Sequence, residues 1–227
     1  MDDGVRHAPD EPSGGTPSLR RAILHGLRRM GPQTPDRLAA ALGASRTGVL
    51  QQLRVLESAG LVRREAERHG VGRPRHVYDV TPAAQDAFPS NYDALSAGLL
   101  AAIDSLGGHE MVEAAFGARG RGLADGIRVR LADRLAPGAT LIDRVRELAL
   151  IQDEQGYLAD AVVIADGTVR LREHNCAIYR VAAGHPEACA AELELFRDVL
   201  GADVTRETHI ASGDRCCSYL VTARAEA

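Results

Sequence analysis

Three short helices, each with its own start and stop signals, occupy the first part of the chain and constrain its fold more than any other feature. Apolar residues recur at helical spacing over 19–30, 35–42 and 46–59. A hydroxyl residue that can cap the N-terminus precedes each predicted helix, and a glycine follows each one. About three residues, including Gly43, separate the second helix from the third, which is the connection that a helix-turn-helix motif requires.

A basic hairpin is expected directly after the third helix. Residues 61–65 and 76–80 have the composition of two short strands, and the segment between them, AERHGVGRPR, is rich in Gly and Arg. Three helices followed by such an arm are typical of a winged helix-turn-helix, which we assign to residues 17–82. Residues 1–16 are rich in Asp, Pro, Gly and Ser, and we expect them to form a disordered tail.

The charge of the chain is divided unevenly. Residues 17–80 contain 12 arginines and 5 acidic residues, although the whole chain has a net charge of −4. This concentration of positive charge indicates an acidic partner, and double-stranded DNA is the partner we expect for a winged helix. A solvated basic surface without a partner is the alternative interpretation.

The third predicted helix separates its apolar residues from its polar ones. When its apolar residues face the core, a set of Thr, Gln and Arg side chains faces outward together. Such side chains can reach phosphates and base edges in the major groove, and the two wing arginines that flank a proline can reach phosphates or the minor groove. The predicted DNA-binding residues are Ser45, Arg46, Thr47, Gln51, Arg54, Arg73 and Arg75.

The remainder of the chain predicts an α+β domain. A helix is expected from Thr81 to about Leu106, with an irregularity at Pro89, and we assign 83–106 as a linker and dimerisation helix. Further helices are expected over 109–134, 141–155 and 186–200, and strands near 161–164, 169–172, 204–210 and 216–222. We therefore assign residues 107–227 as a C-terminal sensor domain with a small antiparallel sheet.

Four cysteines lie in the last quarter of the chain: Cys176, Cys189, Cys216 and Cys217. In a reducing cytosol such clustering favours metal binding or redox chemistry over structural disulfides. Cys189 falls in the first turn of its predicted helix, where the helix dipole favours a thiolate. Side chains alternate along a strand, so the adjacent Cys216 and Cys217 are expected to point to opposite faces, with Cys217 inward.

Cys176, Cys189 and Cys217 can therefore converge from three separate segments. Thiolates from such distant segments differ from the paired C-x-x-C of a zinc ribbon and suit an iron–sulfur cluster at least as well. Zinc binding, a thiol redox switch and three inert buried cysteines remain the alternatives.

The chain resembles the SufR-type iron–sulfur regulators, which are winged-helix transcriptional repressors of cluster-assembly operons. The resemblance covers roughly residues 18–223 and is carried by the wing GRPRHVYDVT, the Phe88-Pro89…Tyr92 segment, EHNC at 173–176, the gap of twelve residues to Cys189, and GDRCCSYLV at 213–221. The wing motif is shared with other winged-helix repressors, so the cysteine arrangement is the more specific part.

This resemblance implies that Cys176, Cys189 and Cys217 bind an iron–sulfur cluster, 4Fe–4S in preference to 2Fe–2S. It also implies a homodimer that binds a palindromic operator. The fourth ligand stays open, with His174, His185, an acid, a small molecule or an open iron site as the possibilities.

Other classes of protein have little support in the sequence. There is no nucleophile elbow, phosphate loop, dinucleotide fingerprint or zinc-protease motif, so an enzyme or small-molecule-binding protein is the least favoured interpretation. No run approaches the ~18 apolar residues of a membrane helix, and the first residues lack the apolar stretch of a secretory signal. We expect a cytoplasmic, non-enzymatic protein with no membrane partner.

Overall fold

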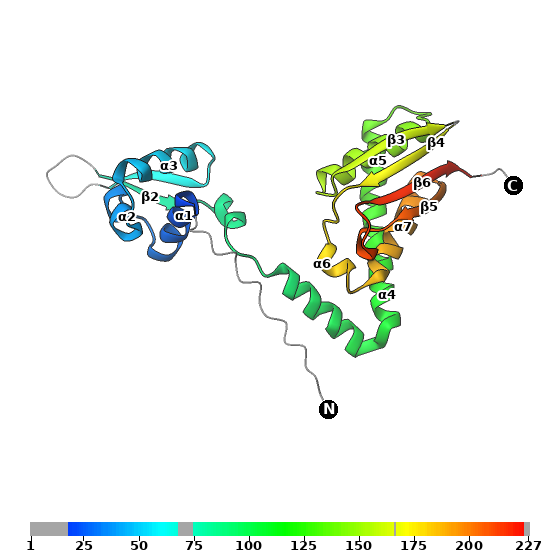
Figure 1. The fold of residues 1–227 in the computed structure, drawn as a ribbon, viewed down its shortest axis with the longest axis horizontal. Helices are drawn as coiled ribbons and strands as arrows, with labels where there is room; N and C mark the ends of the chain where they lie inside the picture. Colours follow the sequence, from blue (N-terminus) through cyan, green and yellow to red (C-terminus); the bar gives the residue numbers. More distant parts are fainter. Residues whose placement is uncertain (1–17, 68–74, 166, 225–227) are drawn as a thin grey trace. The chain divides into compact units, whose positions relative to one another are not determined.

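The computed structural model describes residues 18–67, 75–165 and 167–224, and the chain divides into two compact units, Met1–Ser90 and Asn91–Ala227 (Figure 1). The expected N-terminal tail and the tip of the wing, including Arg73, lie outside the described residues.

The N-terminal unit is the predicted set of three helices and a hairpin. Its elements are α1 (Leu19–Met30), α2 (Pro35–Leu42), α3 (Arg46–Ser58), β1 (Val62–Glu67), β2 (Arg75–Val80) and the 3-10 helix η1 (Pro82–Ala87). The strands are antiparallel, with Val62 opposite Val80 and Glu67 opposite Arg75. Side chains from all three helices form the buried core, among them Ile23, Leu38 and Leu53.

Local side-chain contacts explain why each helix begins where it does. The hydroxyl oxygen of each predicted cap residue accepts a hydrogen bond from the backbone N–H three residues later, which satisfies one of the free donors of the first turn. These bonds join Ser18 to Arg21 at 3.4 Å, Thr34 to Arg37 at 3.3 Å and Ser45 to Gly48 at 3.1 Å. Gly43 ends α2 in the left-handed conformation with φ 61°, which a residue without a Cβ adopts at little cost.

The segment after the wing differs from the prediction at its start. No α-helix begins at Thr81; η1 follows instead, and helix α4 (Tyr92–Arg134) starts only after Pro89. Proline lacks an N–H and disfavours the helical conformation of the residue before it, so the two segments cannot form one helix. Gly108, with φ 68° and ψ −175°, interrupts α4 near the predicted break between its two parts.

The C-terminal unit is an α+β structure around one antiparallel sheet. After α4 it contains α5 (Leu141–Glu154), β3 (Ala159–Ala165), β4 (Thr168–Glu173), α6 (Tyr179–Ala182), α7 (Pro186–Leu200), β5 (Ala202–Thr208), the 3-10 helix η2 (Ile210–Ser212) and β6 (Cys217–Ala223). The strand order is β3-β4-β6-β5. Helix α5 packs against β3 and β4, α7 packs against β5, and α4 packs against both helices (Figure 1).

The two faces of this sheet differ in character. The inner face buries Tyr219 of β6 against Phe196 of α7, with the rings edge to face and their centroids 5.0 Å apart. The outer face carries ion pairs such as Arg170–Glu207, with Nε and Oε2 2.6 Å apart. Alternate side chains of β4 are accordingly buried and half-buried.

Both edge strands of the sheet carry an irregularity in register. Strand β3 shifts against β4 between Val163 and Ala165, and β5 shifts against β6 between Arg206 and Thr208. Within the described parts of the chain, no helix has the length and apolar character required to cross a bilayer.

Candidate DNA interface and candidate metal centre

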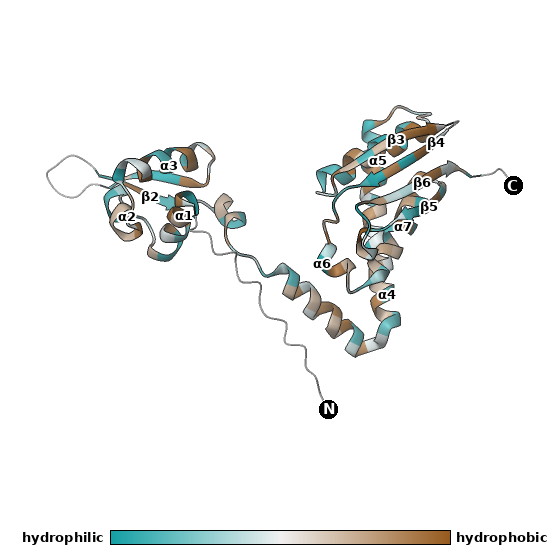
Figure 2. Cartoon of the chain, in the orientation of Figure 1, coloured by the Kyte–Doolittle hydropathy of each residue, from teal (hydrophilic) through white to brown (hydrophobic). Residues whose placement is uncertain are grey.

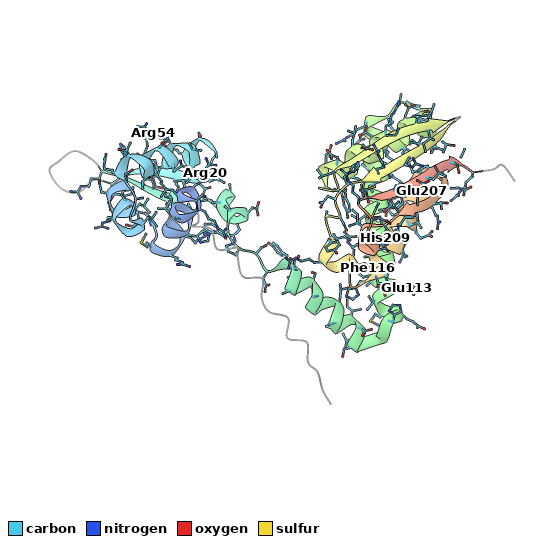
Figure 3. The ribbon with its side chains drawn as sticks, in the orientation of Figure 1. Arg20, Arg54, Glu113, Phe116, Glu207 and His209 are labelled. Atoms are coloured by element: carbon cyan, nitrogen blue, oxygen red, sulfur yellow. The ribbon has the colours of Figure 1, made fainter. Side chains whose placement is uncertain are left out.

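One side of α3 closes the core of the N-terminal unit, while the other side is exposed. Val49 and Leu53 are fully buried, whereas Thr47, Gln51 and Arg54 are exposed. Figure 3 shows Arg54 on α3. Among the described residues, none of these three polar side chains has a hydrogen-bond or ion-pair partner. Their donors and acceptors are therefore available to bases or phosphates.

The first residues of α3 are exposed but already make contacts. The Ser45 hydroxyl caps the helix, and Nε of Arg46 lies 2.7 Å from Oδ1 of Asp36 on α2. Because both side chains of this ion pair are more than half exposed, it stabilises the turn weakly, and a phosphate can compete for Arg46. Ser45 and Arg46 therefore fix the start of α3 and stay candidates for phosphate contact.

The described part of the wing contributes one unpaired arginine. Arg75 is exposed at the start of β2, while Arg73 lies outside the described residues. At the base of the hairpin, Arg63 pairs with Asp79 at 3.3 Å, so some of the basic charge counted in the sequence is neutralised locally. Of the wing residues in the described part of the chain, Arg75 is the one to test.

Arg20 is a basic residue beside α3 that is not among the DNA-binding residues predicted from the sequence. Its Nε lies 3.3 Å from Oε1 of Gln52, which brings an arginine of α1 next to α3 (Figure 3). The signal in the sequence was a basic residue in the first turn of α1, but only the packing of α1 against α3 shows where it lies.

Two of the four cysteines are buried and two are half-buried. Cys189 and Cys217 are buried and Cys176 is half-buried. Cys216 is half-buried directly before β6, and its Sγ lies 3.8 Å from Oγ1 of Thr208, which also lies 2.9 Å from the Ser218 hydroxyl on the side of β6 away from Cys217. The predicted opposite orientation of Cys216 and Cys217 is thus present in the structure.

A buried polar network lies between the segments that carry the three thiols. The hydroxyl of Tyr219 donates to Oε2 of Glu192 at 2.8 Å and lies 3.4 Å from Oε2 of Glu173. The amide of Gln152 donates to Oε1 of Glu173 at 2.9 Å. Burial raises the pKa of both carboxyl groups, and the charge of Glu192 raises that of Glu173 further.

The pKa values of the three thiols reflect the same surroundings. Burial raises the pKa of Cys189 and of Cys217 to about 11, and it raises the pKa of Cys176 as well. Glu192 and Glu173 raise the pKa of all three, so one pair of carboxyl groups acts on the whole set. Burial therefore opposes the thiolate that the helix dipole favours at Cys189, and a bound metal ion would deprotonate such thiols.

Two buried nitrogen atoms adjoin this group without hydrogen-bond partners among the described residues: Nε of Arg206 and Nε2 of His209. The Arg206 guanidinium donates to the carbonyl oxygen of Cys189, and the N–H of Ile210 donates to Sγ of Cys217 at 3.3 Å. Three other buried atoms in the described residues also lack a partner, namely Nε2 of His25, Nε of Arg144 and Oε2 of Glu187.

The three thiols are not arranged as a site for a single metal ion among the described residues. Among the described residues, no three His, Cys, Asp or Glu side chains are arranged closely enough to hold one metal ion. An iron–sulfur cluster contains several iron atoms and takes thiolates from varied spacings, so its ligands need not converge on one point. Soft thiolates are ligands for iron–sulfur clusters and also for zinc.

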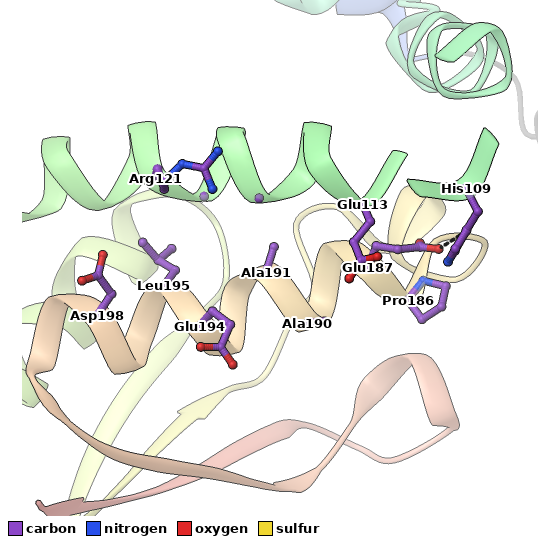
Figure 4. Close-up of a pocket in the computed structure, with 12 residues that line it drawn as sticks. His109, Glu113, Arg121, Pro186, Glu187, Ala190, Ala191, Glu194, Leu195 and Asp198 are labelled. Atoms are coloured by element: carbon purple, nitrogen blue, oxygen red, sulfur yellow. Dashed lines mark ion pairs between the residues drawn. The ribbon is translucent and has the colours of Figure 1, made fainter. Parts of the chain in front are cut away.

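Two cavities border α4 within the C-terminal unit. One, of about 590 Å³, is lined by Cys176 together with Phe116 and residues of α6, so it opens toward the first of the three thiols. The other, of about 600 Å³, lies between α4 and α7 and contains the His109–Glu187 ion pair at 3.1 Å (Figure 4). No cysteine lines this second cavity.

Comparison with known proteins supports the description of the N-terminal unit. Residues 18–65 match the family model of a helix-turn-helix domain. Comparison with the curated proteins gave no match. Among solved structures, a MarR family transcription regulator is 27% identical, with a TM-score of 0.28, over 53% of this chain and 77% of that chain.

Two further solved structures match the chain at lower sequence identity. Bacillus subtilis PadR in complex with operator DNA is 15% identical, with a TM-score of 0.28, over 62% of this chain and 93% of that chain. An H-NOX protein from S. oneidensis in the Fe(II)NO ligation state is 12% identical, with a TM-score of 0.39, over 90% and 99%. These scores are too low to carry an argument, but the family match and the observed helices and wing identify the N-terminal unit as a helix-turn-helix DNA-binding domain.

Proposed function

We propose that this chain is a non-enzymatic transcriptional regulator that binds double-stranded DNA and whose DNA affinity depends on an iron–sulfur cluster held by Cys176, Cys189 and Cys217. The observation that favours the cluster is geometric: Cys189 and Cys217 are buried, Cys176 is half-buried at the edge of a cavity, and the Ile210 N–H donates to Sγ of Cys217 at 3.3 Å. The sequence resemblance favours a repressor of cluster-assembly genes.

The DNA-binding half of the proposal rests on α3. A helix of this kind lies in the major groove with its first residues near the base edges. Thr47, Gln51 and Arg54 then contact bases or phosphates, and Arg75 reaches the flanking backbone. Ser45 and Arg46 hold the start of the helix in place.

The sensing half rests on the C-terminal unit. A bound cluster supplies redox- and oxygen-sensitive chemistry at the three thiols. The Ile210 N–H donates to the sulfur of Cys217, the Arg206 guanidinium adds positive charge beside Cys189, and the cavity at Cys176 gives small molecules access to that thiol. For sensing to occur, DNA must prefer one of the two states, with or without the cluster.

We also propose a homodimer on a palindromic operator. The first part of α4 exposes Leu95, Leu99 and Leu106 to 57%, 57% and 82%, at helical spacing (Figure 2). A second copy of this helix would cover that stripe, and paired half-sites follow from two-fold symmetry. Replacing Leu95 and Leu99 with Glu should give a monomer in sedimentation with unchanged circular dichroism; a variant that stays dimeric, or a monomeric wild type, would contradict the dimer.

The cluster is tested by purifying the full chain without oxygen and measuring visible absorbance, iron and sulfide. We expect a brown protein with iron and sulfide in similar amounts. Cys176→Ala should lose the colour, whereas the matched control Cys216→Ala should keep it. A colourless wild-type protein after reconstitution, or one that contains zinc, would overturn the cluster proposal and leave DNA binding untouched.

Dependence of DNA binding on the cluster is tested separately. Random-sequence DNA duplexes are enriched on the cluster-loaded protein, and the selected duplex is then titrated by fluorescence anisotropy against loaded and metal-free protein. We expect the two forms to differ at least about tenfold in affinity, a coupling typical of allosteric proteins. Equal affinities would contradict regulation by the cluster.

A further inference from the structure

The cavity of about 600 Å³ between α4 and α7 contains a buried carboxylate that the proposed cluster does not use. The side chain of Glu187, in the first turn of α7, is only 10% exposed, and its Oε1 lies 3.1 Å from Nδ1 of His109. Its Oε2 is buried without a hydrogen-bond partner among the described residues, and Nδ1 of His185, at 3.9 Å, is too distant to donate. A donor bound in the cavity would remove the cost of leaving that oxygen unsatisfied.

Acidic side chains continue along the α7 wall of the cavity. Glu187, Glu194 and Asp198 all line it. Their spacing of seven and four residues returns to the same face of a helix, and it places them about 10 Å and about 6 Å apart along the helix axis. Figure 4 shows Glu187 at one end of the cavity, Asp198 at the other and Glu194 between them. The wall therefore carries negative charge along its whole length.

The remaining charges leave the cavity with an excess of acid. Glu113 of α4 adds a carboxylate at the Glu187 end, and it has no hydrogen-bond or ion-pair partner among the described residues (Figure 4). The two other α7 acids pair with arginines that do not line the cavity, but their side chains are 69% and 51% exposed, so these pairs are weak. Of the described residues that line the cavity, Arg121 is the one arginine.

Small residues line the cavity between its charged ends. Gly117 and Gly120 line it from α4, and Ala190 and Ala191 line it from α7. None of these side chains extends beyond Cβ, so an unbranched chain of methylene groups can lie between the two helices. The volume is within the range of sites that bind small molecules.

We propose that this cavity binds a linear aliphatic polyamine, with a terminal ammonium group at Glu187 and further amino groups along Glu194 and Asp198. An ammonium group has donors and no acceptor, which matches walls whose polar atoms are mostly carboxylate oxygens. A metal ion matches less well, because no three His, Cys, Asp or Glu side chains in the described residues are arranged to hold one. No cysteine lines the cavity, so this inference goes beyond the proposed cluster and does not depend on it.

The test is isothermal titration calorimetry of the full-length protein with spermidine, without DNA because polyamines also bind its phosphates. We expect saturable binding. Diacetylated spermidine, whose terminal amines are uncharged amides, should bind at least about tenfold more weakly. Glu187→Gln should lower the affinity for spermidine by a similar factor, because it removes the charge that the ammonium group meets. The matched control Asp153→Asn neutralises an exposed acid of α5 outside the cavity and should bind like the wild type.

A second variant fills the cavity and leaves its charges in place. A Cβ added at Gly117 would meet Nη1 of Arg121 at 3.5 Å, an ordinary van der Waals contact, and leucine favours a helix more than glycine does. Gly117→Leu should therefore keep the circular dichroism spectrum of the wild type and lose spermidine binding.

The assignment is overturned if the wild type shows no saturable spermidine binding, or if Glu187→Gln and Gly117→Leu bind spermidine like the wild type. Equal affinity for diacetylated spermidine would show that charge does not select the ligand. Tighter binding of glutarate, a dicarboxylate, than of spermidine would show that the cavity takes anions instead. None of these results bears on the cluster, which the visible spectrum and the iron and sulfide contents test separately.

Discussion

The two units place their functional polar groups in opposite settings. In the N-terminal unit, Thr47, Gln51 and Arg54 are exposed and have no partner among the described residues. In the C-terminal unit, Glu173 is 1% exposed and hydrogen-bonded, and two of the thiols of interest are buried. Unpaired groups at a surface are typical of a site that meets a large charged partner, whereas buried titratable groups are typical of an enclosed, small ligand. The comparison places the proposed DNA contact at the surface of one unit and the proposed cluster in the interior of the other.

The largest expected effect is a loss of folding stability, and it tests whether the two units unfold independently. Phe196→Ala removes a fully buried ring that contacts Tyr219, which should destabilise the C-terminal unit by about 3–5 kcal/mol. The amides of α1 to α3 should keep their protection in hydrogen exchange. Leu53→Ala is the matched change in the other unit and should expose α1 to α3 alone. If either substitution lowers the hydrogen-exchange protection of both units, the two units do not unfold independently.

The next effect concerns the exposed surface. Arg54→Ala should weaken binding to the selected duplex by about tenfold to hundredfold, the range for losing a side chain that contacts a base, and it should lower the salt dependence if the contact is to phosphate. Arg128→Ala, an exposed arginine of α4, is the control and should bind like the wild type in the same anisotropy titration. If the two variants bind the duplex with equal affinity, Arg54 does not contribute to DNA binding, which contradicts the assignment of α3 to the interface.

A smaller effect concerns the buried carboxyl pair. The pKa of Glu173 is raised above its ordinary value of 4.5, so the folded state holds the proton more tightly than the unfolded chain does. Stability is therefore greatest below the unfolded pKa and falls as the pH rises toward the folded pKa. Glu173→Gln removes this titration and should stabilise metal-free protein by about 1–2 kcal/mol at about pH 8, with little gain at about pH 4.

Urea unfolding at both pH values checks this prediction, with Glu207→Gln as the control. Glu207 has a pKa lowered by its hydrogen bond with Arg170, so its replacement should not stabilise the protein at the higher pH. If Glu173→Gln and the wild type lose stability equally as the pH rises, the buried carboxyl is not the source of the pH dependence.

The smallest expected effect is on the stability of the Arg46→Ala variant, at a residue where we expect DNA affinity to change more than stability. Arg46→Ala removes an exposed ion pair with Asp36 and should change the free energy of unfolding by less than about 1 kcal/mol. Its DNA affinity should nevertheless fall. Asp36→Asn keeps the arginine and should bind DNA at least as well as the wild type. A large loss of stability in Arg46→Ala would mean that the pair matters for the fold.

Local signals in the sequence predicted the N-terminal unit well. Ser18, Thr34 and Ser45 cap their helices as expected, because a cap needs only the residue and the first turn after it. Pro89 was recognised as an irregularity, but the helix assigned before it proved to be a 3-10 helix. Short-range patterns do not show how strongly one residue interrupts a helix.

Contacts between distant segments could not be predicted in the same way. Glu173, Glu192 and Tyr219 come from β4, α7 and β6, and no spacing in the sequence indicates that they share hydrogen bonds. The raised pKa of Cys189 also depends on burial and on Glu192, which its place in the helix does not show. The choice of Cys176, Cys189 and Cys217 over Cys216 stays a prediction, although the inward position of Cys217, which alternation along a strand predicted, agrees with its burial.

The register shifts at the two edges of the four-stranded sheet also affect how the protein behaves at high concentration. An edge strand with an unbroken row of free N–H and C=O groups is a template for the strand of another molecule, and Val163 and its neighbours on β3 are apolar and exposed. The shifts on β3 and β5 interrupt that row and increase the local twist. Strand-by-strand polymerisation is thereby disfavoured at both edges of the sheet.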